Sequence, residues 1–270
     1  MRTVVGTSGF SYPEWRGSFY PESLPEKAML GAYAERLPTV EINNTFYRMP
    51  KPSLFEGWLQ KVPDGFTFAV KAPRRITHLG KLENVAEPTG LFFDTVRTLG
   101  AKLGPLLFQL PPTFKRDEAV LAEFLTLCPA DVSIAFEFRH DSWFTDSVYG
   151  LLSERSAALV AAEVDADEGS GAPFVRTAPF TYVRLRRNTY DEAGLDAAFA
   201  RIQALGVERA FVYMKHEVLG PAYAESLLAL AAGAPRKPLP ALPPAERKPA
   251  AKKTRAPSKA RARTKKSTSE

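Results

Sequence analysis

The stretch EFRHDSWF, residues 137–144, holds the densest group of side chains in this chain that could do chemistry. Glu137 and Arg139 are two residues apart, and side chains two apart on a strand point to the same face of a sheet. Together with His140 and Trp143, they could supply a general acid or base, a clamp for an anion and an apolar stacking wall. The alternative is that Glu137 and Arg139 pair with each other or with neighbours and only satisfy a polar interior.

Lys71 and Glu41 lie at or near the ends of two other apolar runs, FTFAVK and TVEINN. A lysine inside a barrel can form an imine or anchor an anion as a point charge, or it can simply pair with a carboxylate. Two carboxylates can support glycoside or proton-transfer chemistry. We therefore predict Glu137, Lys71 and Glu41 as catalytic groups, with Glu137 moving protons and Glu41 assisting it or orienting the substrate.

Other polar and aromatic side chains lie at the ends of further runs or in the loops that follow them. Hydrogen-bond donors are in excess among them, which favours a polar, anionic or sugar-like small molecule as substrate. The predicted substrate-binding residues are Thr7, Ser8, Asn43, Tyr47, His78, Gln109, Arg139, His140, Trp143, Tyr182 and Arg184.

The sequence predicts no cofactor. The three histidines, His78, His140 and His216, fall in different connections and form no spaced pair, so no metal site is predicted, and a divalent metal remains the weaker alternative. The segment GTSGF near the N-terminus matches neither nucleotide-binding fingerprint.

These residues need elements that bring them to one place. Strand-like runs occur near residues 2–8, 39–44, 66–71, 105–110, 133–139, 159–164, 180–186 and 209–215. Along SIAFEFRH, Ile134, Phe136 and Phe138 face one way, whereas Ala135 and Glu137 face the other. Polar groups collected at one end of many strands require a solvated mouth, which a parallel barrel has at the C-terminal ends of its strands.

Helix-like segments separate these runs, and repeated strand–helix alternation predicts parallel strands. Eight alternations favour an α/β, TIM-barrel-like (β/α)8 barrel over the alternative of an open sheet. The stretch between Asp165 and Phe180 is rich in Gly, Pro and acidic residues, so we expect the sixth helix to be missing or irregular.

The formal charge of +6 is distributed unevenly. Residues 234–270 carry 12 Lys and Arg against 2 Asp and Glu, whereas the preceding body is net negative. We predict a barrel domain over residues 1–233 and a disordered Lys/Arg/Pro/Ala-rich tail over residues 234–270. The tail permits nonspecific, salt-sensitive contact with nucleic acid, or it serves only for solubility.

The sequence has no signal-peptide core and no run near the roughly 18 apolar residues of a spanning helix. It therefore predicts a cytoplasmic protein without a membrane contact, and it leaves the oligomeric state open. The single cysteine, Cys128, cannot form a disulfide within the chain and is expected to be a buried thiol.

Six phrases occur together and in order: GTSGFSYPEWRGSFYP, VEINNTFYRMP, FTFAVKAPRRITH, LGPLLFQLPPTF, EFRHDSWF and TYVRLR. They resemble the YecE-like family, domain of unknown function 72. The resemblance implies a TIM-barrel-like fold with no secure activity, and suggestions of a sugar-isomerase-like or endonuclease-like role rest on fold analogy. The site members that the resemblance implies are Thr7, Ser8, Glu41, Asn43, Tyr47, Lys71, His78, Gln109, Glu137, Arg139, His140 and Trp143.

The chain departs from the family pattern in two places. After TYVRL the family often continues with His-Gly, whereas this chain has Arg186 and Arg187. Near its end the family often has a strand terminus like Tyr-Phe-Asn-Asn, whereas this chain has VYMKHE. Arg186, Lys215 and His216 would then change the charge on that side of the mouth.

Three hypotheses about function remain open from the sequence. The first is an enzyme, isomerase-like or hydrolase-like, that acts by acid/base chemistry on a small molecule at the barrel mouth. The second is a nucleic-acid-binding or endonuclease-like protein helped by its basic tail. The third is a barrel that binds a ligand without catalysis.

Overall fold

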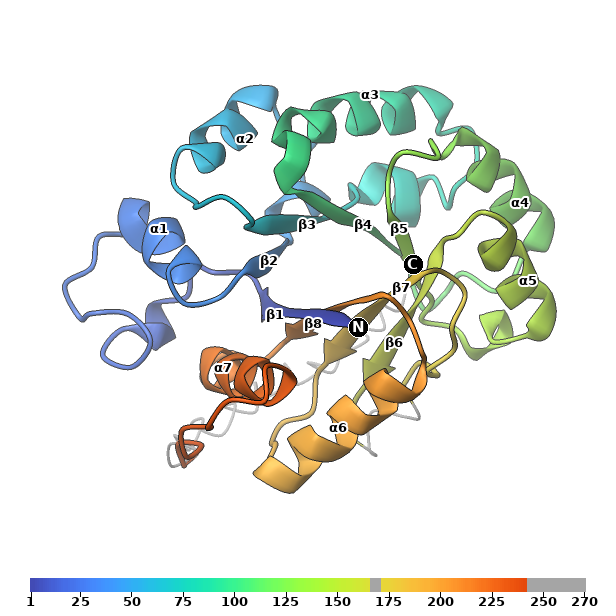
Figure 1. Cartoon of the computed structure of the whole chain (residues 1–270). Helices are drawn as coiled ribbons and strands as arrows, with labels where there is room; N and C mark the ends of the chain where they lie inside the picture. The colour runs from blue at the N-terminus through green and yellow to red at the C-terminus, as the bar shows by residue number, and fades with distance from the viewer. Residues whose placement is uncertain (166–170, 242–270) are drawn as a thin grey trace, which may run out of the picture. The chain divides into compact units, whose positions relative to one another are not determined.

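The computed structural model describes residues 1–165 and 171–241, and eight parallel strands of this part close into one barrel (Figure 1). Each strand pairs with the next, and β8 pairs with β1. The strands are β1 Arg2–Ser8, β2 Thr39–Ile42, β3 Thr67–Lys71, β4 Leu103–Gln109, β5 Ile134–Glu137, β6 Ala158–Glu163, β7 Phe180–Leu185 and β8 Arg209–Met214. The predicted TIM-barrel-like fold is confirmed, and the open sheet is excluded.

Helices surround this barrel and cover the outer side of its strands (Figure 1). They are α1 Met29–Ala34, α2 Pro52–Leu59, α3 Ala86–Val96, α4 Glu118–Leu127, α5 Asp146–Glu154, α6 Glu192–Ala204 and α7 Gly220–Ala231. The described residues between β6 and β7 form no helix, as the Gly- and Pro-rich composition there predicts.

Local signals in the sequence explain where several helices begin. The side chains of Asp117, Thr145 and Asp191 accept hydrogen bonds from backbone N–H groups in the first turns of α4, α5 and α6. This capping satisfies donors that a helix start otherwise leaves without a partner. Helices α2 and α7 instead carry a proline in the first turn, where the missing N–H costs nothing.

The strands separate two layers of apolar side chains. Ile134, Phe136 and Phe138 belong to the large outer core beneath the helices, whereas Ala135 belongs to a smaller cluster inside the barrel. The same division holds on β4, where Leu107 faces inward. The predicted alternation of a bulky outer face and a small inner face holds on β5. On β7 and β8 the inner cluster instead contains the aromatic rings of Phe180, Tyr182, Phe211 and Tyr213.

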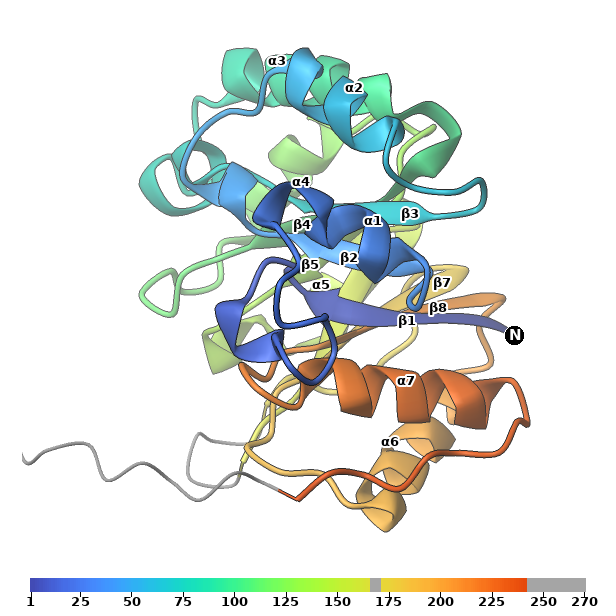
Figure 2. The same ribbon diagram turned by 90° about the vertical axis from the view of Figure 1, so that its left-hand side faces the viewer.

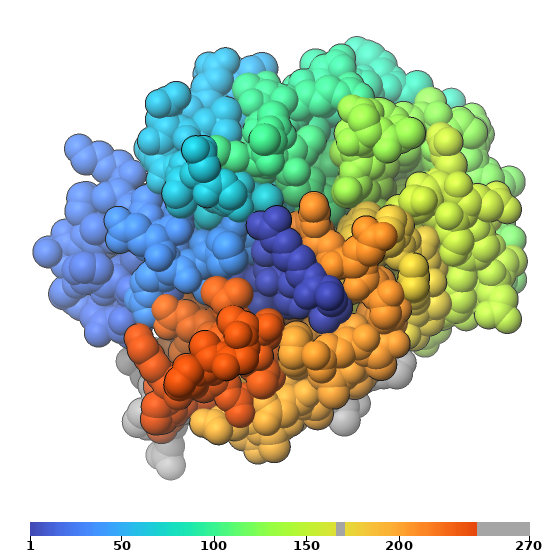
Figure 3. All heavy atoms as spheres, viewed as in Figure 1, coloured from blue at the N-terminus to red at the C-terminus, as the bar shows by residue number. Residues whose placement is uncertain are grey.

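The two ends of the barrel differ. Figure 2 shows the N-terminus at one end and the loop that follows β1 at the other, with α7 running alongside β1. Figure 3 shows the N-terminal end, where the first residues, in dark blue, lie in the middle of the face. The mouth at the C-terminal ends of the strands is the opposite end.

The described chain continues past α7 without regular structure to residue 241. Arg236 forms ion pairs with Asp196 and Glu192 of α6, and Leu239 packs against the outer core. Most of the predicted tail, residues 242–270, lies outside the described residues. Cys128 is a buried free thiol, as predicted, and burial raises its pKa to about 12. Among the helices described here, none has the length and apolar character needed to cross a membrane.

Candidate functional site at the barrel mouth

Arg184 of β7 bridges two carboxylates inside the barrel, Glu41 of β2 and Glu137 of β5. Its Nη2 donates to Glu41 Oε1 at 3.0 Å, and its Nη1 donates to Glu137 Oε2 at 2.6 Å. All three residues are buried. Buried charges are tolerated when they are paired and hydrogen-bonded. These three residues therefore form a rigid set of ion pairs beneath the mouth.

Three further donors hold Glu41. Ser8 Oγ and Asn43 Nδ2 donate to Oε1 at 2.6 and 3.0 Å, and the Tyr182 hydroxyl donates to Oε2 at 2.7 Å. Burial alone would raise the pKa of Glu41, but Arg184 and these three hydrogen bonds lower it below its ordinary value. Glu41 is therefore a fully ionised anchor for its neighbours.

Glu137 is held in the same way. Gln109 Nε2 donates to Oε2 at 2.7 Å, and Arg139 Nε lies 2.6 Å from Oε1 as an ion pair that lacks hydrogen-bond alignment. Burial alone would raise the pKa of Glu137, but Arg184, Arg139 and Gln109 bring it down to about 2. A carboxylate with so low a pKa carries no proton at neutral pH and is a weak base.

Lys71, at the end of β3, has a different environment. Its Nζ donates to Gln109 Oε1 at 2.7 Å and lies 4.2 Å from the centre of the Phe46 ring. Within the described part of the chain it has no carboxylate at ion-pair distance. Burial and then Arg184 lower the pKa of Lys71 to about 8, so part of this lysine is a neutral amine near neutral pH.

Gln109 fixes where the Lys71 amine points. Its amide oxygen accepts from Lys71 and its amide nitrogen donates to Glu137, so only one orientation of the amide satisfies both neighbours. The carboxylates and Arg184 thus position Gln109, and Gln109 positions Lys71.

A cavity of about 490 Å³ opens above this network, and we call it the primary cavity. Its size suits a small-molecule site. It is lined by Ser8, Tyr12, Asn43, Phe46, Tyr47, Lys71, His78, Gln109, Arg139, Arg184 and Lys215. Four of these described residues are lysine or arginine and none is a carboxylate, because Glu41 and Glu137 lie beneath the surface of the cavity.

One wall of the primary cavity is aromatic. The Phe46 ring meets the edges of Tyr47 and His78 at centroid distances of 5.2 and 4.8 Å. Tyr47 is 73% exposed at the rim. His78 lies on the π-helix Arg75–Leu79 that follows β3, a type of turn often found at functional sites. Burial, and then Lys71 and Arg139, lower the pKa of His78.

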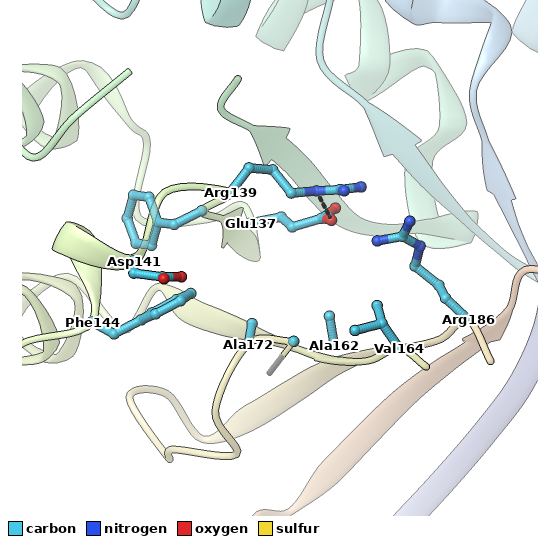
Figure 4. Close-up of a pocket in the computed structure, with 10 residues that line it drawn as sticks. Glu137, Arg139, Asp141, Phe144, Ala162, Val164, Ala172 and Arg186 are labelled. Atoms are coloured by element: carbon cyan, nitrogen blue, oxygen red, sulfur yellow. Dashed lines mark ion pairs between the residues drawn. The ribbon is translucent and has the colours of Figure 1, made fainter. Parts of the chain in front are cut away.

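A smaller side cavity of about 230 Å³ lies next to the primary cavity, on the β5–β7 side (Figure 4). Arg139 lines both cavities. In Figure 4 the Arg186 guanidinium points from the opposite side toward the Arg139–Glu137 ion pair, and Ala162, Val164 and Ala172 form an apolar floor.

Most predicted site residues meet at the mouth, and several lie elsewhere. The predicted residues that line the primary cavity are Ser8, Asn43, Tyr47, Lys71, His78, Gln109, Arg139 and Arg184. Thr7 instead donates to the Gly9 carbonyl and is buried. Trp143 is buried with its ring stacked on Phe138 at 4.6 Å, and His140 accepts from the Ser142 N–H within its own loop.

Three residues of the primary cavity are absent from the predicted set: Tyr12, Phe46 and Lys215. Lys215 comes directly after β8, and the sequence pointed to it only as a charge on that side of the mouth. Tyr12 and Phe46 lie in loops without periodicity, and only their position just after β1 and β2 pointed to the mouth. The described residues contain no cluster of three or more His, Cys, Asp or Glu side chains that could hold a metal ion.

A family model described as "Protein of unknown function DUF72" matches residues 4–248. The chain is 30% identical to UPF0759 protein YecE of Escherichia coli (strain K12) over 141 residues, 52% of this chain and 49% of that protein. It is 29% identical to UPF0759 protein YunF of Bacillus subtilis (strain 168) over 140 residues, 49% of this chain and 50% of that protein. The chain thus spans about half the length of the curated relatives it matches.

Two crystal structures of DUF72 family proteins are similar to this barrel. The protein of Thermotoga maritima MSB8 superposes with a TM-score of 0.75 at 25% identity, over 85% of this chain and 99% of that chain. The protein of Enterococcus faecalis V583 gives a TM-score of 0.70 at 18% identity, over 87% and 98%. These matches confirm the predicted resemblance and the fold.

Proposed function

This chain belongs to the DUF72 family, and we propose that it is an enzyme that binds an anionic, sugar-like small molecule in the primary cavity and moves a proton on it with the Lys71 amine. One observation carries the proposal. Four cations and no carboxylate line the described cavity, around a lysine whose pKa burial and Arg184 lower to about 8.

The charge of the cavity supports an anionic ligand. Burial is the largest cause that lowers the pKa of Lys71, His78 and Lys215, and neighbouring cations lower each of these pKa values further. An anion bound among these groups would relieve their repulsion. Arg139 and Arg184 could also stabilise negative charge that develops on a reacting oxygen.

The aromatic wall supports a sugar-like ligand. Phe46 and Tyr47 offer apolar ring surface, and the amide groups of Asn43 and Gln109 line the same cavity. A carbohydrate has the matching character, since its C–H faces are apolar and its hydroxyl groups need hydrogen bonds.

The state of the two carboxylates argues against glycoside hydrolysis. That reaction needs one carboxyl group with a raised pKa as acid and a second one free to act as base or nucleophile. Glu41 and Glu137 both have lowered pKa values and both are held by Arg184. In the proposed reaction Glu137 therefore positions Gln109 and Arg184, and Lys71 removes a proton from a carbon next to a carbonyl group, as in an isomerase.

Deuterium exchange tests this proposal. The protein is incubated in D₂O with a panel of aldose and ketose phosphates, including fructose 6-phosphate, and proton NMR follows the hydrogen next to the carbonyl. We expect the wild type to exchange it for at least one sugar phosphate, and Lys71→Met to slow the exchange at least about 100-fold. Lys61→Met, at an exposed lysine beside α2 and away from the mouth, is the matched control and should exchange like the wild type.

Two results would contradict the proposal: no exchange with any sugar phosphate, or equal exchange by the wild type and Lys71→Met. Binding of an oligonucleotide at the mouth in preference to every sugar phosphate would favour the nucleic-acid hypothesis instead. We propose the cytoplasm as the location, in keeping with the free thiol of Cys128.

A further inference from the structure

A second cavity of about 490 Å³ adjoins the primary cavity, and we call it the outer cavity. It is lined by Tyr12, Arg186, Arg187, Asn188, Lys215, His216, Glu217 and Val218. Tyr12 and Lys215 line both cavities, so the two spaces share a boundary. A ligand in the primary cavity could extend past Lys215 into the outer one.

Resting on the proposed function, we infer that the substrate carries a second anionic group and that Lys215 binds it in the outer cavity. The substrate class is then a sugar-sized molecule with a phosphate or carboxylate group at each end. One group lies among Lys71, Arg139 and Arg184, and the other lies beyond Lys215.

The charges of the outer cavity support this inference. Arg187 is already paired with Glu163 and Asp165, at 3.4 and 3.8 Å. Lys215 has no ion pair among the described residues. The groups that act on it most, after burial, are Arg184, Arg186 and Arg139, and together they lower its pKa. A cation that faces cations lacks a counter-ion, and a bound anion would supply one.

No other acidic group in the described structure supplies a counter-ion to Lys215. Glu217 lines the outer cavity, but no ion pair joins its carboxylate to Lys215. Glu41 is the acid that raises the pKa of Lys215, and its contribution is smaller than that of the three arginines. Glu41 is itself engaged by Arg184 in the floor of the barrel.

The wall of the outer cavity is fixed in place by His216. Its Nδ1 accepts from the backbone N–H groups of Val218 and Leu219, at 3.1 and 2.9 Å. Its Nε2 lies 2.9 Å from the Asn188 carbonyl oxygen and must therefore donate to it. The Asn188 N–H in turn donates to Asp165 at 2.7 Å. The loops after β7 and β8 are thus joined, and a preorganised wall loses little entropy on binding.

Calorimetric titration with three probes tests the inference: fructose 1,6-bisphosphate, fructose 6-phosphate and uncharged fructose, each at low salt. We expect the wild type to bind the bisphosphate at least about tenfold more tightly than the monophosphate, the usual size of one charge-assisted contact. Lys215→Met should reduce this preference to within about twofold, and Lys61→Met should retain it. Lys71→Met should weaken the binding of the bisphosphate and of the monophosphate by a similar factor.

The outcomes separate this inference from the proposed function. If the wild type binds both phosphates alike, or if Lys215→Met weakens both by the same factor, the second anion site is wrong and the proposed function stands. If neither phosphate binds more tightly than fructose, both are wrong. Thermal unfolding of each variant checks that Lys215→Met leaves the fold intact.

Discussion

Arg184 determines what the two carboxylates of the barrel can do. It crosses the interior from β7 and keeps Glu41 and Glu137 ionised, so neither is suited to carry a proton. Lys71 is joined to this triad through Gln109, and burial, followed by Arg184, lowers its pKa to about 8. In the proposed function the reactive group is therefore the lysine, and the buried charges position it.

Replacing Arg184 should destabilise the protein strongly. Arg184→Met leaves two buried carboxylates without their common partner, and breaking a buried ion pair in this way costs about 3–5 kcal/mol. Urea unfolding at neutral pH measures the loss. Adding Glu41→Gln and Glu137→Gln to the same chain should recover part of it, because the unpaired charges are then gone. A loss below about 1 kcal/mol for Arg184→Met would contradict the account.

Glu137 should make the protein sensitive to acid. Its ordinary pKa is 4.5, and Arg184, Arg139 and Gln109 offset burial and lower it to about 2 in the folded state. Since the unfolded chain then binds more protons, this stabilisation is complete above about pH 4.5 and is lost as the pH falls toward 2. Urea unfolding across this range should show a shallower loss for Glu137→Gln. Parallel curves for the variant and the wild type would refute the assignment.

At the scale of elements, the strands were predictable and the contacts between their side chains were not. Alternation on β5 tells which face Phe136 and Glu137 take, because successive side chains point to opposite sides. It does not tell which partner a long side chain reaches across a barrel. The sequence offered a carboxylate as the partner of Lys71, whereas the structure shows the amide oxygen of Gln109.

Site residues that lie in loops were also difficult to predict from the sequence. Tyr12 and Phe46 line the primary cavity from connections with no period of 2 or 3.6 residues, so no pattern could assign them a face. Trp143 shows the opposite case: it stands beside the densest reactive stretch, yet its ring packs on Phe138 in the core. Aromatic residues near a site motif serve binding or packing, and sequence alone does not separate the two.

The close approach of β1 and β2 predicts the effect of a small substitution. A Cβ atom at Gly6 would lie 2.0 Å from the backbone oxygen of Thr39, so Gly6→Ala must push the two strands apart. We expect a loss of about 1–3 kcal/mol in urea unfolding. Gly57→Ala in α2, where nothing lies within 4 Å, is the matched control and should gain up to about 1 kcal/mol. Equal stabilities for the two variants would contradict the strand geometry.

At the scale of the whole molecule, charge is divided between the barrel and the chain that follows it. The sequence after residue 233 carries 12 basic against 2 acidic residues, while the mouth gathers its own separate set of cations. The two basic regions predict two kinds of contact. We expect sequence-independent attraction to nucleic acid from the tail and small-molecule binding from the barrel.

Removing residues 242–270 should separate these contacts. Fluorescence anisotropy with a single-stranded oligonucleotide should show salt-dependent binding by the full chain and little by a chain that ends at residue 241. Fructose 6-phosphate should bind both chains with the same affinity. Oligonucleotide binding that persists after the truncation would show that the barrel binds the oligonucleotide, and it would favour a nucleic-acid function.

The ionisation of Lys71 tests the central claim most directly. Reductive methylation with ¹³C-labelled formaldehyde gives each lysine an NMR signal that titrates with its amine, and Lys71→Arg identifies the signal of Lys71 by its loss. The account predicts that this signal titrates near pH 8, well below the ordinary 10.5. A Lys71 signal that titrates near 10.5 with the exposed lysines would show that the cavity does not prepare this amine for proton transfer.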